Sequence, residues 1–317
     1  MWSTETVVEA LRGRGELWQT IPGHVGLRGD ALTLYRRIEA RIASLALAET
    51  VDEWSVPSII SLETLERAAY FSSFPQWLTV ASHLSGEADA LERIARSPNP
   101  ATEVPSALER PTAALPPAVC YHIYEELADR MLDGPRLIGA QGMCWRHEGE
   151  RLQPLERGWA FTMRELVCVS SSAKVERFRR DLMERALRLA GELALDARLE
   201  VASDPFFAPT ASGRAMLQTF KSLKHEILLP IGGEREIAAA SFNHHETFFG
   251  ESFDIRMASG EPAASGCAAF GIERWFLAFL VTHGPDAKSW PTIRLPLRAA
   301  AVPSKGIART AARANGS

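Results

Sequence analysis

The chain has 317 residues, of which 46% are hydrophobic and 23% are charged, so it can bury a sizeable core without covalent cross-links. Its 35 Lys and Arg against 39 Asp and Glu give a net charge of -4, which argues against a broadly nucleic-acid-binding surface but leaves room for a local basic patch. The longest apolar runs, such as residues 275–281, are too short to cross a bilayer, and residues 1–10 lack the pattern of a signal peptide. We therefore expect a cytoplasmic protein with no membrane segment and with its four cysteines reduced.

The first part of the chain differs in composition from the rest. Residues 1–118 carry ten Arg and no Lys against fifteen Asp and Glu, with short helical and strand patterns and no heptad repeat. Six prolines between residues 96 and 119 argue against a helix or a central strand there. We therefore predict an N-terminal region of residues 1–115, a main domain of residues 116–300 and a flexible tail of residues 301–317.

The main domain alternates helical and strand-like patterns. They predict helices over residues 121–132, from Ser170 to Leu195 with a basic outer face, and over residues 272–282. Strands are predicted over residues 136–145, 159–169, 199–202, 225–229 and 237–242. Hairpins with segregated helices indicate an α+β domain with a mainly antiparallel sheet.

Nucleotide binding, if present, must depend on side chains, because the chain has neither GxxxxGK[ST] nor GxGxxG after a strand. The candidates lie in residues 144–165, which contain CWRHEG and RGWAFTMRE, and in residues 270–274, FGIER. With KSLKHEILLP at 221–230 and EIAAASFN at 236–243, these segments resemble, in order, the motifs of class II aminoacyl-tRNA synthetases, above all the seryl-tRNA synthetases. Four short patterns in the right order are much more specific than any one.

The resemblance covers residues 115–300 and implies a class II synthetase-like antiparallel sheet flanked by helices, with a smaller N-terminal α/β region. It also implies that a carboxylate is activated by ATP with Mg²⁺. Arg146 and Arg274 would be the catalytic residues, because planar guanidinium groups stabilise a crowded anionic transition state. Any one of these residues taken alone would be read as a surface ion pair.

The same resemblance assigns the nucleotide contacts. Arg146 would bind the α-phosphate, Glu148 would orient the adenine amino group and Phe161 would stack on the base. Arg274 would cover the other face of the base and contact the γ-phosphate. The remaining ATP contacts would be Arg157, Gly158 and Lys224, while Glu236 with Ala238, Ala239, Ala240 and Ser241 would hold magnesium and the ribose.

Three residues occupy positions at which archaeal-type seryl-tRNA synthetases and a shorter relative hold a catalytic zinc: Cys120, Glu165 and Cys267. Two thiolates and a carboxylate leave a fourth tetrahedral position open. The resemblance implies that the α-amino group of the substrate fills it, with Glu165 and Asn243 as amino-acid contacts. Without the flanking motifs each cysteine would be a small buried hydrophobe, as we expect for Cys144 and Cys168.

The shorter relative is the bacterial amino acid:[carrier protein] ligase family, which lacks the tRNA-binding arm. Residues 203–210 and a short helix through Met216 and Phe220 also resemble this family, in which such a helix helps to dock the carrier. The resemblance implies that glycine or alanine is transferred to the phosphopantetheine thiol of an acyl carrier protein by a homodimer. Candidate carrier contacts are Arg214, Lys221 and the basic long helix.

The predicted absence of a tRNA partner depends on the first 118 residues, which are acidic, broken by prolines and without a coiled coil. Two alternatives stay open: a seryl-tRNA synthetase-like tRNA ligase, and a regulatory paralogue without catalysis. The paired His244 and His245 need not act as bases in this chemistry, and we expect them to line the pocket.

Overall fold

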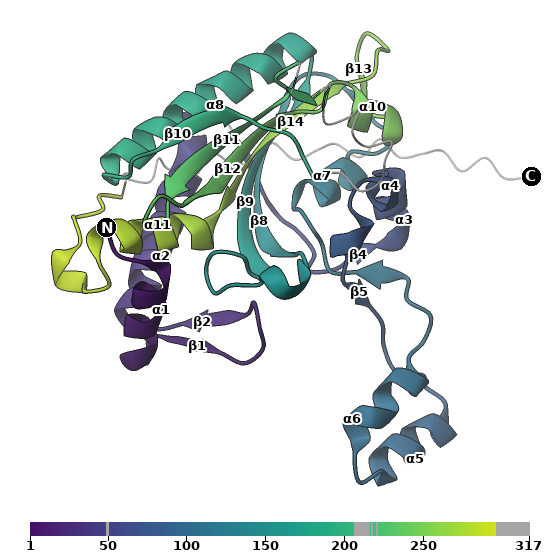
Figure 1. Ribbon diagram of the computed structural model, residues 1–317. Coiled ribbons are helices and arrows are strands. Elements are labelled where there is room, and N and C mark those ends of the chain that lie inside the picture. Colours follow the sequence, from purple (N-terminus) through teal and green to yellow (C-terminus); the bar gives the residue numbers. More distant parts are fainter. Residues whose placement is uncertain (49–50, 206–215, 217, 220, 296–317) are drawn as a thin grey trace, which may run out of the picture.

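The structure, a computed structural model, describes residues 1–48, 51–205, 216, 218–219 and 221–295. At its centre lies a seven-stranded sheet in the order β10-β11-β12-β14-β9-β8-β3 (Figure 1). In that order the strands span Arg198–Val201, Lys224–Pro230, Glu236–His244, Ala264–Gly271, Ala160–Ser170, Arg136–Trp145 and Asp52–Ser55. All neighbouring strands are antiparallel except β3 and β8, which confirms the expected mainly antiparallel α+β fold.

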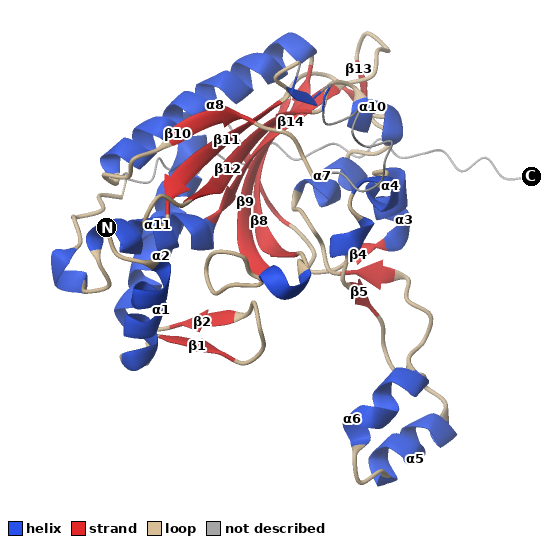
Figure 2. Cartoon of the chain, in the orientation of Figure 1, coloured by secondary structure: helices blue, strands red, loops and turns tan. Residues whose placement is uncertain are grey.

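Four helices build the larger hydrophobic core on one side of the sheet (Figure 2). They are α1 (Thr4–Gly13), α2 (Gly29–Ala43), α8 (Ser172–Glu192) and α11 (Ile272–His283). The helix α11 is buried almost all round, because its apolar residues contact both the sheet and α2. The helix α8 is amphipathic and packs its apolar stripe on β14, β12 and β9, which leaves Arg177, Arg180 and Arg188 on the outer surface, whereas Arg179 is buried.

The other side of the sheet carries a smaller core and shorter elements. Its helices are α3 (Leu62–Arg67), α4 (Tyr70–Ser73), α7 (Cys120–Glu126) and α10 (Phe248–Ser252). Two small sheets lie here, β4-β6-β5 (Ile60–Ser61, Ala113–Ala114, Val80–Ala81) and the pair β7 and β13 (Met131–Leu132, Arg256–Met257). Because side chains alternate along a strand, Leu166 of β9 enters the larger core while Glu165 points toward α7.

The remaining elements lie at the periphery. A hairpin of β1 (Leu17–Gln19) and β2 (Val25–Leu27) follows α1, and α5 (Ala88–Arg96) and α6 (Pro100–Glu103) project away from the rest of the molecule (Figure 1). The 3₁₀ helices are η1 (Ser44–Ala48), η2 (Pro75–Trp77), η3 (Val104–Ala107), η4 (Gly149–Arg151) and η5 (Ala287–Ser289). Among the described residues, no helix combines the length and the hydrophobicity that a bilayer crossing requires.

Two expectations about local structure were wrong. The helix expected over residues 121–132 ends at Glu126, because Asp129 adopts a left-handed backbone with φ 58° and its N–H bonds to the Phe253 carbonyl. The proline-rich stretch does contain regular structure. Pro100 begins the short helix α6, where its missing N–H costs nothing, and the two-residue β6 is the middle strand of its sheet.

The expected division near residue 115 stays a prediction, although α1 and α2 share the larger core with α8 and α11, and β3 extends the main sheet. Several other expectations fall on residues that the structure does not describe. They are the stretch from Phe206 to Thr210, Arg214, the helix end at Phe220 and the tail of residues 301–317.

Candidate active site

The structure places every residue predicted to bind ATP, the amino acid or zinc around one cavity of about 1280 Å³. The cavity lies on the sheet face opposite the helices of the larger core. It is lined by Cys120, Arg146, Glu148, Arg157, Gly158, Phe161, Glu165, Lys224, Glu236, Ala238, Ala239, Ala240, Ser241, Asn243, Cys267 and Arg274. Six separate elements and one loop contribute to this set, so the cavity depends on the whole sheet rather than on one local motif.

The loop between β8 and β9 carries four of these residues: Arg146 and Glu148 near its start, and Arg157 and Gly158 near its end. The paired strands bring Trp145 opposite Ala160, so Arg146 and Arg157 enter the cavity from the same edge of the sheet. Leu155 anchors the loop: its side chain is only 2% exposed and packs in the larger core, with its backbone at φ 63°. The loop is therefore held over the cavity by buried apolar surface.

Arg146 lies between two aromatic rings. Its guanidinium carbon is 5.8 Å from the centre of the Trp77 ring and 5.5 Å from that of Phe161, and its Nε donates to the Pro117 carbonyl at 3.0 Å. Such stacking fixes the plane of a guanidinium group while leaving its outer nitrogens able to bind a ligand. The ring of Phe161, predicted to stack on adenine, therefore also supports Arg146.

Arg274 is held by two backbone carbonyls. Its Nε donates to Glu156 at 2.9 Å and its Nη1 donates to Ala238 at 2.7 Å. Burial, followed by the nearby guanidinium groups of Arg157 and Arg146, lowers the pKa of Arg274 to about 10, so it remains a cation at neutral pH. Several arginines that repel one another inside a cavity favour a multiply charged anion as their ligand.

Three acidic residues of the cavity, Glu148, Asp204 and Glu226, are already paired with basic side chains. Arg157 donates to Glu148, and Lys224 forms ion pairs with Asp204 at 2.5 Å and Glu226 at 2.9 Å. Burial of Lys224 opposes its charge, but the two carboxylates together raise its pKa, so it stays protonated. Asp204 and Glu226 were not assigned a role from sequence, because only the fold brings Asp204 beside Lys224.

Glu236 differs from the other acids. It forms an ion pair at 2.5 Å with Arg198 of the edge strand β10, and this hydrogen bond lowers the pKa of Glu236. Its predicted role in holding magnesium stays a prediction. Glu226, whose side chain is less exposed than that of Glu236, places a second carboxylate on the cavity wall, where it is opposite Ser241 in the pairing of β11 with β12.

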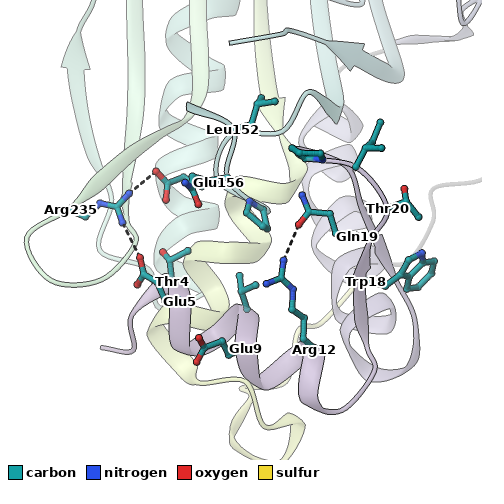
Figure 3. Close-up of a pocket in the computed structure, with 15 residues that line it drawn as sticks. Thr4, Glu5, Glu9, Arg12, Trp18, Gln19, Thr20, Leu152, Glu156 and Arg235 are labelled. Atoms are coloured by element: carbon teal, nitrogen blue, oxygen red, sulfur yellow. Dashed lines mark hydrogen bonds and ion pairs between the residues drawn. The ribbon is translucent and has the colours of Figure 1, made fainter. Parts of the chain in front are cut away.

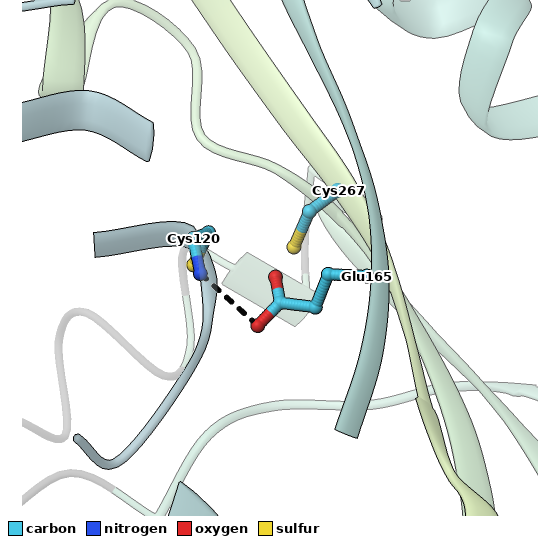
Figure 4. A group of neighbouring side chains, drawn as sticks. All are labelled: Cys120, Glu165 and Cys267. Carbon is cyan, nitrogen blue, oxygen red and sulfur yellow. Dashed lines mark hydrogen bonds between the residues drawn. The ribbon is translucent and has the colours of Figure 1, made fainter. Parts of the chain in front are cut away.

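The predicted metal ligands converge at the other end of the cavity (Figure 4). Cys120 begins α7, Glu165 lies on β9 and Cys267 lies on β14, and their ligand atoms all lie within 4.8 Å of one another. In the pairing of β14 with β9, Cys267 is opposite Val167 and Ala269 is opposite Glu165, so the two ligands are diagonal neighbours on one face. A thiol from α7 completes the group.

The chemistry of this group fits a divalent metal. Glu165 is 1% exposed; its Oε1 accepts from the backbone N–H groups of Val119 at 2.8 Å and Cys120 at 3.3 Å, while its buried Oε2 has no partner among the described residues. Burial and the neighbouring Cys267 raise the pKa of Glu165 to about 8. Buried polar atoms normally have a partner, so the free carboxylate oxygen indicates a missing ligand. Together with the two thiols it forms a set of ligand atoms that zinc prefers.

Polar groups surround the Cys267 thiol. Asn243, predicted to contact the amino acid, donates from Nδ2 to Cys267 Sγ at 3.5 Å, and His245 Nε2 lies 3.9 Å from the same sulfur. The other ring nitrogen of His245 lies 3.2 Å from the hydroxyl of Tyr124. His245 therefore contacts a candidate metal ligand, as well as lining the cavity as expected. The remaining cysteines, Cys144 and Cys168, are buried thiols outside this group, as expected.

A second hollow of about 960 Å³ lies between α1, the β1–β2 hairpin and the loop of residues 152–156 (Figure 3). None of the predicted site residues lines it. Arg235 crosses this region from the turn before β12, with its guanidinium 2.6 Å from Glu156 and 3.9 Å from Glu5. Glu156 borders both hollows, and its carbonyl is the acceptor for Arg274.

Comparison with known proteins finds relatives of two kinds. The chain is 33% identical over 264 residues to amino acid--[acyl-carrier-protein] ligase 1 of Bradyrhizobium diazoefficiens, which covers 81% of this chain and 80% of the relative. Ligase 2 of the same organism is 34% identical over 280 residues, covering 85% and 81%. The type-2 serine--tRNA ligase of Methanopyrus kandleri is 30% identical over 258 residues, or 74% of this chain and 48% of that protein. No family model matches the chain.

The fold is also that of a solved structure. M. kandleri SerRS in complex with A. aeolicus tRNASec superposes with a TM-score of 0.79 at 24% sequence identity, covering 90% of this chain and 59% of that chain. The class II synthetase-like fold inferred from four short motifs is therefore confirmed.

Proposed function

Because the chain belongs to the amino acid--[acyl-carrier-protein] ligase family, we propose that it activates a small amino acid, glycine or alanine, with ATP and transfers it to the phosphopantetheine thiol of an acyl carrier protein. The observation that carries the proposal is that cationic side chains and a thiol–carboxylate–thiol group border one cavity. The cationic side chains suit a triphosphate, and the thiol–carboxylate–thiol group suits a metal that binds an amine.

In the first step the amino-acid carboxylate attacks the α-phosphate and pyrophosphate leaves. This step needs little proton transfer, so charge and position matter most. Arg146, which stacks near Trp77 and Phe161, would contact the α-phosphate, and Arg274 would neutralise charge toward the γ-phosphate. Glu148 must exchange its bond to Arg157 for one to the adenine amino group.

The amino acid is positioned by the other end of the cavity. Cys120, Glu165 and Cys267 would hold a zinc ion, which supplies a Lewis-acidic position for the α-amino group. Asn243 lies beside Cys267 and lines the same space, so it is placed to contact the substrate.

The acceptor is the part of the proposal that depends most on the relatives' names. Residues 1–118 are acidic and contain no heptad repeat, so they offer little to offset the charge of an RNA backbone. We infer a holo-carrier protein as the acceptor, no tRNA partner, a cytoplasmic location and a homodimer.

Two assays test the function. ATP–pyrophosphate exchange with each common amino acid, with zinc supplied, should proceed with glycine or alanine. No exchange with any amino acid would instead support a regulatory paralogue. Labelled amino acid should then appear on a holo-carrier and be released by a thioester-cleaving amine, whereas label on tRNA or on an apo-carrier would show a different acceptor.

A further inference from the structure

We propose that the aromatic side of the cavity, formed by Tyr70, Phe74, Trp77 and Tyr121, binds the phosphopantetheine arm of the acceptor, and that the Tyr70 hydroxyl donates a hydrogen bond to it. We call these four residues the aromatic wall. The proposal rests on the proposed function and adds to it a place for the second substrate.

The first observation is an unpartnered hydroxyl. Tyr70 is 2% exposed and lines the cavity, yet its Oη has no hydrogen-bond partner among the described residues. Buried polar groups almost always have a partner, so an unpartnered one that borders a cavity indicates a ligand. Burial raises the pKa of Tyr70 to about 12, so the hydroxyl keeps its proton and acts as a donor.

The second observation is a continuous aromatic surface. The rings of Phe74 and Trp77 stack with centres 5.6 Å apart and planes 5° apart, and Tyr70 contacts Phe74 at 5.9 Å and Tyr121 at 6.0 Å. Tyr70 comes from α4, Trp77 from η2 and Tyr121 from α7, and Phe74 joins α4 to η2. A mostly uncharged ligand with methyl and amide groups, such as pantetheine, fits a wall that is apolar and carries one donor.

The third observation is the position of the wall. Trp77 lies 5.8 Å from the guanidinium of Arg146, which is proposed to hold the α-phosphate, and Tyr121 follows the candidate metal ligand Cys120. The acyl–phosphate bond of the adenylate must lie between the groups that hold its phosphate and its amine. A thiol that approaches along the aromatic wall therefore arrives at the acyl carbon.

The chemical step is a simple substitution. The sulfur forms a bond to the acyl carbon, the bond from that carbon to the phosphate oxygen breaks, and AMP leaves with the electron pair. The thiol proton passes to solvent. The residues predicted to bind adenine, Phe161, Glu148 and Arg274, line the same cavity but do not belong to the wall.

The test measures the two steps separately: activation of the amino acid by pyrophosphate exchange, and its transfer to free pantetheine as the acceptor. Tyr70→Phe, which removes only the hydroxyl, should raise the KM for pantetheine about fivefold, and Trp77→Leu should raise it about tenfold. In Tyr70→Phe, which keeps the stacking of Trp77 on Arg146, the KM values for ATP and glycine, measured by pyrophosphate exchange, should change less than that for pantetheine. Phe71→Ala is the matched control, because Phe71 lies on the same helix, is 42% exposed and does not line the cavity.

Three results would overturn the proposal. An unchanged KM for pantetheine in both variants would show that the wall does not contact the arm, and a parallel rise in the KM for ATP in Tyr70→Phe would assign the wall to the nucleotide. If the wild-type enzyme shows no exchange, the proposed function is wrong. Direct titration of pantetheine into wild type and Tyr70→Phe then decides the subsite, and equal affinity would refute it.

Discussion

At the scale of single residues, the site consists of two groups that the sheet holds apart. Glu165 has one carboxylate oxygen fixed by two backbone N–H groups and the other without a partner among the described residues, beside the thiols of Cys120 and Cys267. Arg274 is oriented by two carbonyl groups rather than by a carboxylate, so its charge remains available to a ligand. Each group leads to a prediction.

The purified protein should contain about one zinc per chain, as expected for a single three-ligand site with an open position. Cys267→Ala should remove the metal and the exchange activity together, because two ligands are too few to retain it. Cys168→Ala should keep both, since Cys168 is a buried thiol of the larger core. Elemental analysis of the three proteins checks this, and wild type without zinc would contradict it.

Arg274→Ala should slow adenylate formation about a hundredfold or more, because it removes a preorganised positive charge that stabilises the transition state. Arg96→Ala is the matched control, since that guanidinium is 80% exposed and lies on the projecting helix α5. Pyrophosphate exchange measures the effect, and circular dichroism verifies that the variant is folded. A normal exchange rate in folded Arg274→Ala would show that this residue does not hold ATP.

At the scale of elements, the loop between β8 and β9 is fastened from outside the cavity. Arg235, in the turn before β12, forms an ion pair with Glu156, and the carbonyl of Glu156 orients Arg274 (Figure 3). This contact joins the loop that carries Glu148 and Arg157 to the strand that carries Ala238. The pair therefore links the two sides of the proposed nucleotide site.

Arg235→Ala should raise the KM for ATP about threefold, as a half-exposed ion pair of this kind contributes little more than 0.5 kcal/mol, and should leave the KM for glycine unchanged. The reciprocal double variant Glu156→Arg with Arg235→Glu should recover part of the loss, which a merely destabilising change would not do. Glu5→Gln is the control, because its contact with Arg235 is long and exposed. Equal changes in both KM values would contradict a role confined to the nucleotide.

Individual strands and helices also show how much of the structure could be predicted from the sequence. Strand β8 matches its predicted range because all ten of its residues pair with β9. The helix after Cys120 was predicted too long, because the contact of Asp129 with Phe253 comes from a segment more than a hundred residues away. The site residues within motifs all line the cavity, whereas Tyr70 lies in no recognised segment and the pairing of Asp204 with Lys224 could be identified only from the fold.

At the scale of the whole molecule, the cavity and the basic helix lie on opposite faces of the sheet. The residues of α8 pack in the larger core, while the cavity is bordered by side chains that point the other way from β9, β12 and β14. A carrier whose arm enters the cavity cannot also cover the outer face of α8. Of the described candidate contacts, Lys221 is the better placed, because it lies three residues before the cavity residue Lys224.

Charge-reversal variants distinguish carrier docking at Lys221 from docking on the outer face of α8. Lys221→Glu should raise the KM for an acidic holo-carrier several-fold, about what the loss and reversal of one rim charge produces, because the side chain is exposed and its present partner is the surface residue Glu246. The double variant Arg177→Glu with Arg180→Glu on the outer face of α8 should leave that KM unchanged. With free pantetheine as the acceptor, Lys221→Glu should behave as wild type, since pantetheine lacks the protein surface that Lys221 would contact. A rise in the carrier KM caused by the α8 variant, with Lys221→Glu unaffected, would place the docking surface on the far side of the sheet and contradict entry of the arm past the aromatic wall.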